Sequence, residues 1–442
     1  MKEMLCAVAV VVTGVIAATA SAQEADPAIV RHIESIRAID NHAHVMGPNR
    51  ATDKGYDQLR CDELPVTPSG LPPQTLRFNP AQQAAVRTLY GFDLIDDLEP
   101  SIRKLQSVAA STREKNGADH YAWVLDQAGL LTVLANRTAM VPELSPPRFL
   151  WVPYADALMF PLDNGALGTA NPDRNALFTM ADALERSYLR DAGLSRVPPT
   201  LDAYVDRVLR ATLRRQKSAG AVAVKFEVAY LRSLAFDVVS REAAASVYSR
   251  FAAGGRPAAS IYRPLQDYLF RQIALEAGRL GMAVHIHTGS GCGEYFDDSG
   301  ASAMLLSPML NDSQLRNTRF VLLHGNRPRE RDVAVLIAKP NVYVDTSVLG
   351  FFMSTRELAT VLRPWLESMP ERVLFGTDAG PFGPGLDWEE TTLIGAQQFR
   401  KALAVVLTEM VADGVVTRDR AMEVADGVLA RNAATLYRLK QP

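Results

Sequence analysis

Residues 37–44 read Arg-Ala-Ile-Asp-Asn-His-Ala-His, an apolar run that ends on two histidines two residues apart, His42 and His44. Three other segments also follow apolar, β-branched runs: His285-Ile-His287-Thr-Gly289, His324-Gly-Asn and Gly376-Thr-Asp378-Ala-Gly-Pro-Phe-Gly. The chain has 7 histidines in 442 residues, and five of them lie at these strand ends. Histidines and a carboxylate that meet in this way are what a metal site needs.

Short apolar runs of the kind buried in a parallel sheet occur eight times. The predicted strands are 35–44, 130–136, 149–155, 222–227, 282–287, 319–324, 342–345 and 373–378. Amphipathic helical patterns lie between several of them or close the chain, at 201–217, 262–280, 329–338, 356–366, 391–412 and 418–439. Eight such units predict an α/β fold, a (β/α)8 TIM barrel, whose functional residues come from the C-terminal strand ends.

The predicted strands are unevenly spaced. Long stretches separate the first strand from the second and the third from the fourth, and runs rich in proline and glycine occur near 65–73 and 142–147. We expect these stretches to be insertions over the barrel mouth after strands 1 and 3, not separate domains. Residues 23–442 are therefore predicted to form one barrel domain.

The N-terminus has the features of an export signal. An apolar stretch runs from Leu5 to Ala18, and the small residues Ala20-Ser21-Ala22 precede Gln23. No second apolar span long enough to cross a membrane follows. We predict a signal peptide at residues 1–22 and an exported, periplasmic or secreted protein, without a membrane anchor after cleavage.

Charge and cysteine content limit the partners. A net charge of −2 without long basic runs argues against nucleic acid and against an anionic membrane surface. A small-molecule substrate is favoured, and a homo-oligomer is compatible with the sequence.

After signal cleavage two cysteines remain, Cys61 and Cys292, and a single disulfide bond between them is possible.

The two histidines of the first strand form a candidate chelating pair. Residues two apart on a strand point the same way and lie about 6–7 Å apart, within reach of one ion. Two hydrogen-bonded core histidines are the alternative for this motif alone. His324 and Asp378 at other strand ends would supply further ligands or acid/base groups. Imidazole and carboxylate suit Zn²⁺, and a catalytic site leaves one position for water.

Taken in order, the four motifs resemble the amidohydrolase superfamily, in its amidohydrolase-related ("amidohydrolase 2") branch of metal-dependent TIM-barrel hydrolases. The resemblance extends from about residue 36 to the C-terminus. It implies that His42, His44 and His287 coordinate a divalent metal, and that Asp378 completes the site and activates water. It also implies that His324 is a proton shuttle, or a ligand in a binuclear site.

Lys225 and Glu227 end the fourth strand, in Val-Ala-Val-Lys-Phe-Glu. In some members of the superfamily a carbamylated lysine here bridges two metals, and in others a lysine contacts the substrate. A solvated lysine is the alternative, but a lysine that ends an apolar strand more often has a partner. Glu227 shares its face and is a weaker candidate for a bridging ligand. His285 is expected one layer deeper, as a buried, hydrogen-bonded residue.

Other residues give weaker signals. The glycine-rich loop 288–293 has amides that could receive an anionic group, or it is a simple turn. Arg232 and Arg327, near the ends of strands 4 and 6, are candidates for gripping a substrate carboxylate, with surface arginine as the alternative. Asp345 is expected to orient a histidine ligand. Cys292 has no basic partner placed by the sequence and is not predicted to be a nucleophile.

These signals together predict a metal-dependent hydrolase with one or two divalent ions, Zn²⁺ first. The ion-activated water would attack a C–N or C–O bond of a small molecule, with Asp378 and His324 as the catalytic residues. A non-oxidative decarboxylase of the same superfamily is the first alternative. A non-catalytic metal- or solute-binding barrel is the second, and the extra acid/base groups argue against it.

Overall fold

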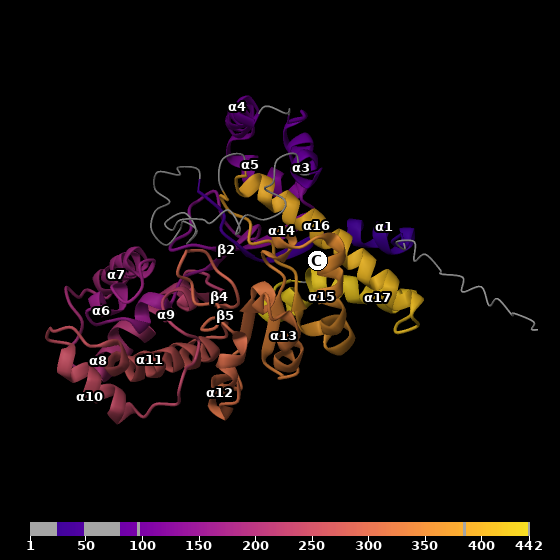
Figure 1. Cartoon of the computed structure of the whole chain (residues 1–442). Helices are drawn as coiled ribbons and strands as arrows, with labels where there is room; N and C mark the ends of the chain where they lie inside the picture. Colours follow the sequence, from indigo (N-terminus) through magenta and orange to yellow (C-terminus); the bar gives the residue numbers. More distant parts are fainter. Residues whose placement is uncertain (1–23, 48–79, 95–97, 383–385, 441–442) are drawn as a thin grey trace, which may run out of the picture.

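The computed structural model describes residues 24–47, 80–94, 98–382 and 386–440. Eight parallel strands lie at the centre of this part of the chain, and helices surround them (Figure 1). The strands are β1 (Ala38–Ala43), β2 (Leu130–Asn136), β3 (Phe149–Val152), β4 (Ala223–Phe226), β5 (Ala283–His287), β6 (Phe320–Leu323), β7 (Val342–Asp345) and β8 (Val373–Leu374).

Backbone hydrogen bonds close these strands into a barrel. The strands form two ladders, β1-β2-β3 and β4-β5-β6-β7-β8. At one seam, the amide of Lys225 donates to the carbonyl of Pro153 at 2.8 Å. At the other, the amide of Asp378 donates to the carbonyl of His42 at 2.8 Å. All eight predicted strands are present, in the (β/α)8 arrangement that the sequence predicts.

Helices and helical turns occupy much of the described chain between the strands. The longer helices are α1 (Pro27–Ser35), α3 (Pro80–Tyr90), α4 (Leu98–Asn116), α5 (His120–Gln127), α7 (Arg174–Asp191), α9 (Ala211–Ser218), α10 (Arg241–Phe251), α11 (Ala259–Arg279), α13 (Glu330–Ile337), α15 (Thr355–Ser368), α16 (Trp388–Ala412) and α17 (Arg418–Asp426). The shorter ones are α6 (Gly165–Gly168), α8 (Leu201–Tyr204), α12 (Ser307–Leu310), α14 (Leu349–Phe352) and α18 (Asn432–Tyr437).

Within the described residues, both long insertions contain helices. The first contains α3, α4 and α5, which stand together beside α16 (Figure 1). Tyr90 and His120 of this insertion contact Glu390 and Glu389 at the start of α16, next to the segment that follows β8. The second contains α6 and α7, which lie on the same side of the molecule as α8, α10 and α11 (Figure 1).

Side chains that alternate along the strands divide the core into two parts. Every second strand residue packs inside the barrel, and the interior set is Ile39, Leu134, Val152, Ala223, Ala283, Val321, Leu323 and Leu374. Ala433, Leu436 and Tyr437 of α18 pack into the same cluster. The other strand residues face the surrounding helices in the larger core. The barrel is therefore filled and closed at one end, which leaves functional groups for the other.

The strand prediction at 35–44 begins too early, because α1 occupies Pro27–Ser35. Asp26 caps this helix by accepting a hydrogen bond from the amide of Ala28, and proline stands at its first position.

The proposed signal peptide and Cys61 lie outside the described residues. Within them, no helix is both long and apolar enough to cross a membrane. Cys292 is disulfide-bonded, which removes it further from any role as a nucleophile.

Candidate metal centre

The C-terminal strand ends bring the predicted site residues together. His42 and His44 lie at the end of β1, and Asp378 lies in the segment that follows β8. The backbone fixes this pairing, because the amide of His44 donates to the carbonyl of Ala379 at 2.7 Å. Asp40 strengthens it by accepting hydrogen bonds from the amide and hydroxyl of Thr377.

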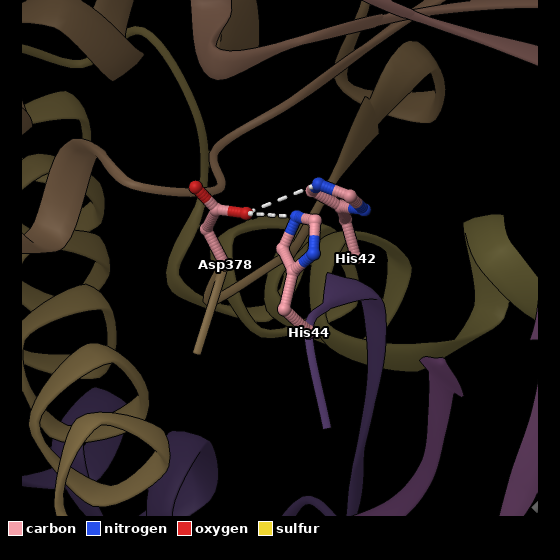
Figure 2. A group of neighbouring side chains, drawn as sticks. All are labelled: His42, His44 and Asp378. Carbon is pink, nitrogen blue, oxygen red and sulfur yellow. Dashed lines mark ion pairs between the residues drawn. The ribbon is translucent and has the colours of Figure 1, made fainter. Parts of the chain in front are cut away.

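Three side chains converge on one point (Figure 2). The Oδ1 atom of Asp378 lies 3.0 Å from Nε2 of His42 and 3.5 Å from Nε2 of His44. Despite these short distances the buried Oδ1 atom accepts no hydrogen bond from a described residue. One ligand atom from each residue lies within 4.8 Å of the others. A buried carboxylate oxygen that meets two imidazole nitrogens without a hydrogen bond fits a divalent cation held between them.

His287 and His324 lie next to this group. Their ring centroids are 4.5 Å apart, and that of His324 is 5.5 Å from that of His42. The Nε2 atom of His287 is buried and has no hydrogen-bond partner among the described residues, so it is available to a ligand. Nδ1 of His324 lies 3.9 Å from Oδ2 of Asp378. Neither histidine belongs to the compact group of three.

Lys225 and Glu227 both enter the site from β4. Lys225 is fully buried, and its Nζ lies 3.2 Å from Nε2 of His42 and 3.1 Å from Oε1 of Glu227. The other oxygen of Glu227 lies 3.6 Å from Nδ1 of His287. The solvated-lysine alternative is therefore wrong. Lys225 and Glu227 remain competing candidates for a bridging ligand, because both face the histidines.

Burial sets the charge state of these groups. It lowers the pKa of His42 and His324 well below the ordinary value and that of His287 to about 4. The imidazoles are therefore neutral, which is the form that binds metal. Burial also raises the pKa of Asp378, and the neighbouring Lys225 opposes that change. A buried carboxylate that is ionised requires a positive charge close to it, such as a bound cation.

A second layer of hydrogen bonds supports His324. Its Nδ1 lies 2.9 Å from Oγ of Ser347, which donates to Oδ1 of Asp345 at 2.6 Å. The other oxygen of Asp345 accepts from Nδ2 of Asn41 at 2.9 Å. Asp345 thus contacts the ring of His324 by way of Ser347, a residue that the sequence pattern did not single out. The sequence feature that could have pointed to Ser347 is its position two residues after Asp345.

The network continues to the closed end of the barrel. The hydroxyl of Tyr437 donates to Oδ1 of Asn41 and lies 2.6 Å from Nε2 of His285. His285 is fully buried, and burial lowers its pKa to about 3. It is the deeper, hydrogen-bonded histidine that the sequence predicts.

The backbone is strained at two of the predicted site residues. His324 has φ 66° and Asp378 has φ 60°, in the left-handed region that residues other than glycine rarely adopt. Such strain costs about 1–3 kcal/mol per residue and persists where the surrounding structure enforces it, often at functional sites. Both residues are held by the hydrogen bonds described above.

The arginine predictions fare differently. Arg232 has partners within the protein. Its guanidinium pairs with Asp267 at 2.7 Å and donates to Gln266 and to the carbonyl of Ala235. It is not free to grip a substrate. Arg327 makes no ion pair with any described residue, and its guanidinium stacks on the ring of Phe352 at 4.7 Å. Arg327 therefore remains a candidate for contact with substrate.

The glycine-rich loop after β5 does not offer its first amides to an anion. The amide of Gly289 donates to Ala301 and that of Ser290 donates to Arg327. Gly289 has φ 78°, and a Cβ atom there would collide with the backbone of Arg327. Glycine is required at this position because the loops after β5 and β6 touch.

The barrel, with histidines and a carboxylate clustered at its strand ends, fits the amidohydrolase class of TIM barrels. Residues 169–439 match the family model described as amidohydrolase, over more than half of the chain. The protein therefore belongs to the amidohydrolase family. Over 189 residues it is 32% identical to Protein fluG of Emericella nidulans, a match that covers 40% of this chain. The match spans only 20% of that longer relative.

Solved structures share the architecture. A protein described as a metal-dependent hydrolase from Lactobacillus casei ATCC 334 has a TM-score of 0.63 at 17% identity, covering 93% of this chain and 97% of its own. Glucuronate isomerase from Caulobacter crescentus has a TM-score of 0.62 at 13% identity, covering 94% of each chain. At these identities the likeness establishes the barrel fold. The predicted TIM barrel is confirmed, and a divalent metal is what the family implies.

Proposed function

We propose that this protein is a hydrolase that uses a metal-activated water to cleave a C–N or C–O bond of a small molecule. The observation that carries the proposal is the convergence of His42, His44 and Asp378 on one point, where a buried carboxylate oxygen accepts no hydrogen bond from a described residue. Acid/base groups beside that point favour catalysis over a purely structural ion, because a structural site is closed by its ligands.

His42, His44 and Asp378 would hold the ion, with His287 next to them. When bound, a divalent ion would polarise the scissile carbonyl-type group and lower the pKa of a water molecule. Asp378 would take a proton from the attacking water and pass it to the leaving group. His324, which contacts Ser347, would steady the charge that develops on the substrate oxygen.

The number of ions depends on Lys225. Its Nζ lies beside both His42 and Glu227, so a carbamylated Lys225 would help to hold a second ion, with His287 and His324 as further ligands. Zn²⁺ is the ion we propose, because neutral imidazole and carboxylate suit it. Near two ions per chain, falling to one or fewer in Lys225→Ala, would establish a bridged pair. One ion that is indifferent to Lys225→Ala would establish a single-metal site.

The reaction class is tested by product analysis on the metal-loaded enzyme. A panel of small amides, esters and aromatic or unsaturated acids is incubated in ¹⁸O-water, with Asp378→Asn as the inactive control. Hydrolysis places ¹⁸O in the acid product. Release of CO₂ without ¹⁸O incorporation would replace our proposal by the decarboxylase alternative, and conversion at constant mass would indicate an isomerase.

We also propose that the protein is exported and cleaved before Gln23, and that its substrate is a small molecule without nucleic-acid or membrane partners. This rests on the apolar N-terminal stretch and the near-neutral charge. Mass spectrometry of the protein from the host periplasm should give a mature N-terminus at Gln23. An uncleaved cytoplasmic chain would contradict export and leave the hydrolase proposal untouched.

A further inference from the structure

A tyrosine just beyond the end of β3 reaches the metal centre. Tyr154 is fully buried, and its hydroxyl oxygen lies 3.3 Å from Nδ1 of His44. The other ring nitrogen of His44, Nε2, faces Oδ1 of Asp378 at 3.5 Å (Figure 2). The hydroxyl of Tyr154 and the carboxylate of Asp378 therefore contact different nitrogens of one imidazole ring.

Hydrogen bonds hold the backbone of Tyr154 on both sides. The amide of Lys225 donates to the carbonyl of Pro153, and the amide of Ala155 donates to the carbonyl of Lys225, each at 2.8 Å. The carbonyl of Tyr154 itself accepts from the hydroxyl of Tyr188, in α7, at 2.6 Å. These bonds fix Tyr154 at the seam between β3 and β4. A side chain on a backbone held in this way can orient a neighbouring ring.

The position of the proton on His44 decides whether its Nε2 can bind an ion. A neutral imidazole carries a proton on one nitrogen and a free lone pair on the other. An ion at Nε2 therefore requires the proton on Nδ1, and a buried N–H group requires an acceptor. The phenolic oxygen of Tyr154 is an acceptor at hydrogen-bond distance from that nitrogen.

We propose that Tyr154 is a positioning residue for His44. Its hydroxyl oxygen accepts a hydrogen bond from the Nδ1–H group and thereby keeps the lone pair of Nε2 directed at the ion site. Such partners of a ligating histidine fix both its tautomer and its ring orientation. This inference rests on the proposed function, in which His44 holds the ion. It gives the β3 end a part in the metal centre, although none of the four sequence motifs lies there.

The first test compares Zn²⁺ binding by two tyrosine variants. Tyr154→Phe removes only the hydroxyl. Tyr248→Phe is the matched control, because Tyr248 is also fully buried and its hydroxyl donates to the carbonyl of Pro198 at 2.8 Å, in α10. Dissociation constants for Zn²⁺ are measured on the full chain by competition with a chromogenic chelator. Urea unfolding of the metal-free proteins shows how far each variant is destabilised.

We expect Tyr154→Phe to weaken Zn²⁺ binding about 10–100-fold, as the loss of a supporting partner of a metal ligand commonly does. Tyr248→Phe should bind Zn²⁺ as the wild type does, even if it is destabilised to the same extent. Equal Zn²⁺ affinity in Tyr154→Phe and the wild type would overturn the proposal. An equal loss in both variants would also overturn it, because general loosening of the fold would then explain the effect.

The second test observes the proton directly. Histidine labelled with ¹⁵N is incorporated into the Zn²⁺-loaded protein, and the signal of His44 is identified by its absence in His44→Gln. The wild type should show the proton on Nδ1, in slow exchange with water. In Tyr154→Phe the same proton should exchange faster, because it has lost its acceptor. Equal exchange rates in the two proteins would contradict the hydrogen bond to Tyr154.

These results are distinguishable from a failure of the proposed function. A protein that shows both Tyr154 effects but hydrolyses no substrate would contradict the hydrolase proposal and keep the positioning role. A metal-dependent hydrolase whose Zn²⁺ affinity is indifferent to Tyr154→Phe would contradict the positioning role alone.

Discussion

Single residues of the site were predictable where one strand sets their direction. His42 and His44 follow from the two-residue period of a strand, and Lys225 follows from its place at the end of an apolar run. Ser347, Asn41 and Tyr437 were not predictable as partners, because their contacts join residues far apart in the chain. Asn41 is 304 positions from Asp345 and 396 from Tyr437. Arg232 was misassigned for the same reason, since its partner Asp267 lies on another element.

Ser347→Ala tests whether the second layer positions His324. The variant removes the hydroxyl that contacts Nδ1 of His324 at 2.9 Å, so the ring loses its orienting partner. We expect kcat to fall about 10–100-fold, as supporting residues of metal sites commonly show. KM and metal content should stay close to those of the wild type. Ser246→Ala, on the exposed face of α10, is the control. An unchanged kcat would show that Ser347 does not position His324.

At the scale of elements, the strands and the later helices were predictable and the inserted helices were not. α4 is largely polar and lacks the broad apolar stripe that marks a buried helix, so its pattern gives little signal. α1 was missed although its start is marked by Asp26 and Pro27. α7 contains a buried carboxyl group, that of Glu185. Its burial was not predictable, because neighbouring elements set its environment.

Glu185 should make the stability of the fold depend on pH. Burial raises its pKa to about 8, with Asp182 adding to the effect, and its Oε1 has no hydrogen-bond partner among the described residues. An unfolded glutamate titrates near about 4.3. Between these values only the folded state keeps the proton, so the free energy of unfolding falls as pH rises from about 4 to 8.

Glu185→Gln removes this dependence. We expect the variant to gain about 3–4 kcal/mol relative to the wild type on going from pH 5 to pH 8, as the shifted pKa implies. Urea unfolding at both pH values measures it. Arg190→Gln is the control, because Arg190 lies on the exposed face of the same helix. Parallel pH profiles of wild type and Glu185→Gln would contradict the assignment.

α18 should stabilise the closed end of the barrel through Tyr437. Its hydroxyl contacts both Asn41 and His285 inside the barrel, where no water can replace it. Tyr437→Phe should therefore lower the free energy of unfolding by about 1–3 kcal/mol. Tyr343→Phe is the control, because Tyr343 is only partly buried at the same end. Equal stability of the two variants would show that the hydroxyl contributes little.

At the scale of the whole molecule, the order of the four motifs along the chain predicts both the fold and the class of protein. Four polar strand ends, spaced by helical segments, can meet only if parallel strands present the same end to one mouth. The backbone bonds from Asp378 to His42 and from His44 to Ala379 show how β8 and β1 meet there. Substrate choice was not predictable, because the rings around His287, such as those of Tyr230 and Phe296, come from segments far apart in the chain.

The metal content of the purified protein tests the central claim most directly. Elemental analysis without chelators should find at least one divalent ion per chain in the wild type, and a small fraction of that in His44→Ala. His32→Ala should keep the full content, because His32 is partly exposed on α1 and pairs with Asp426. A wild-type protein that holds no ion, even after supplementation with Zn²⁺, would contradict the account.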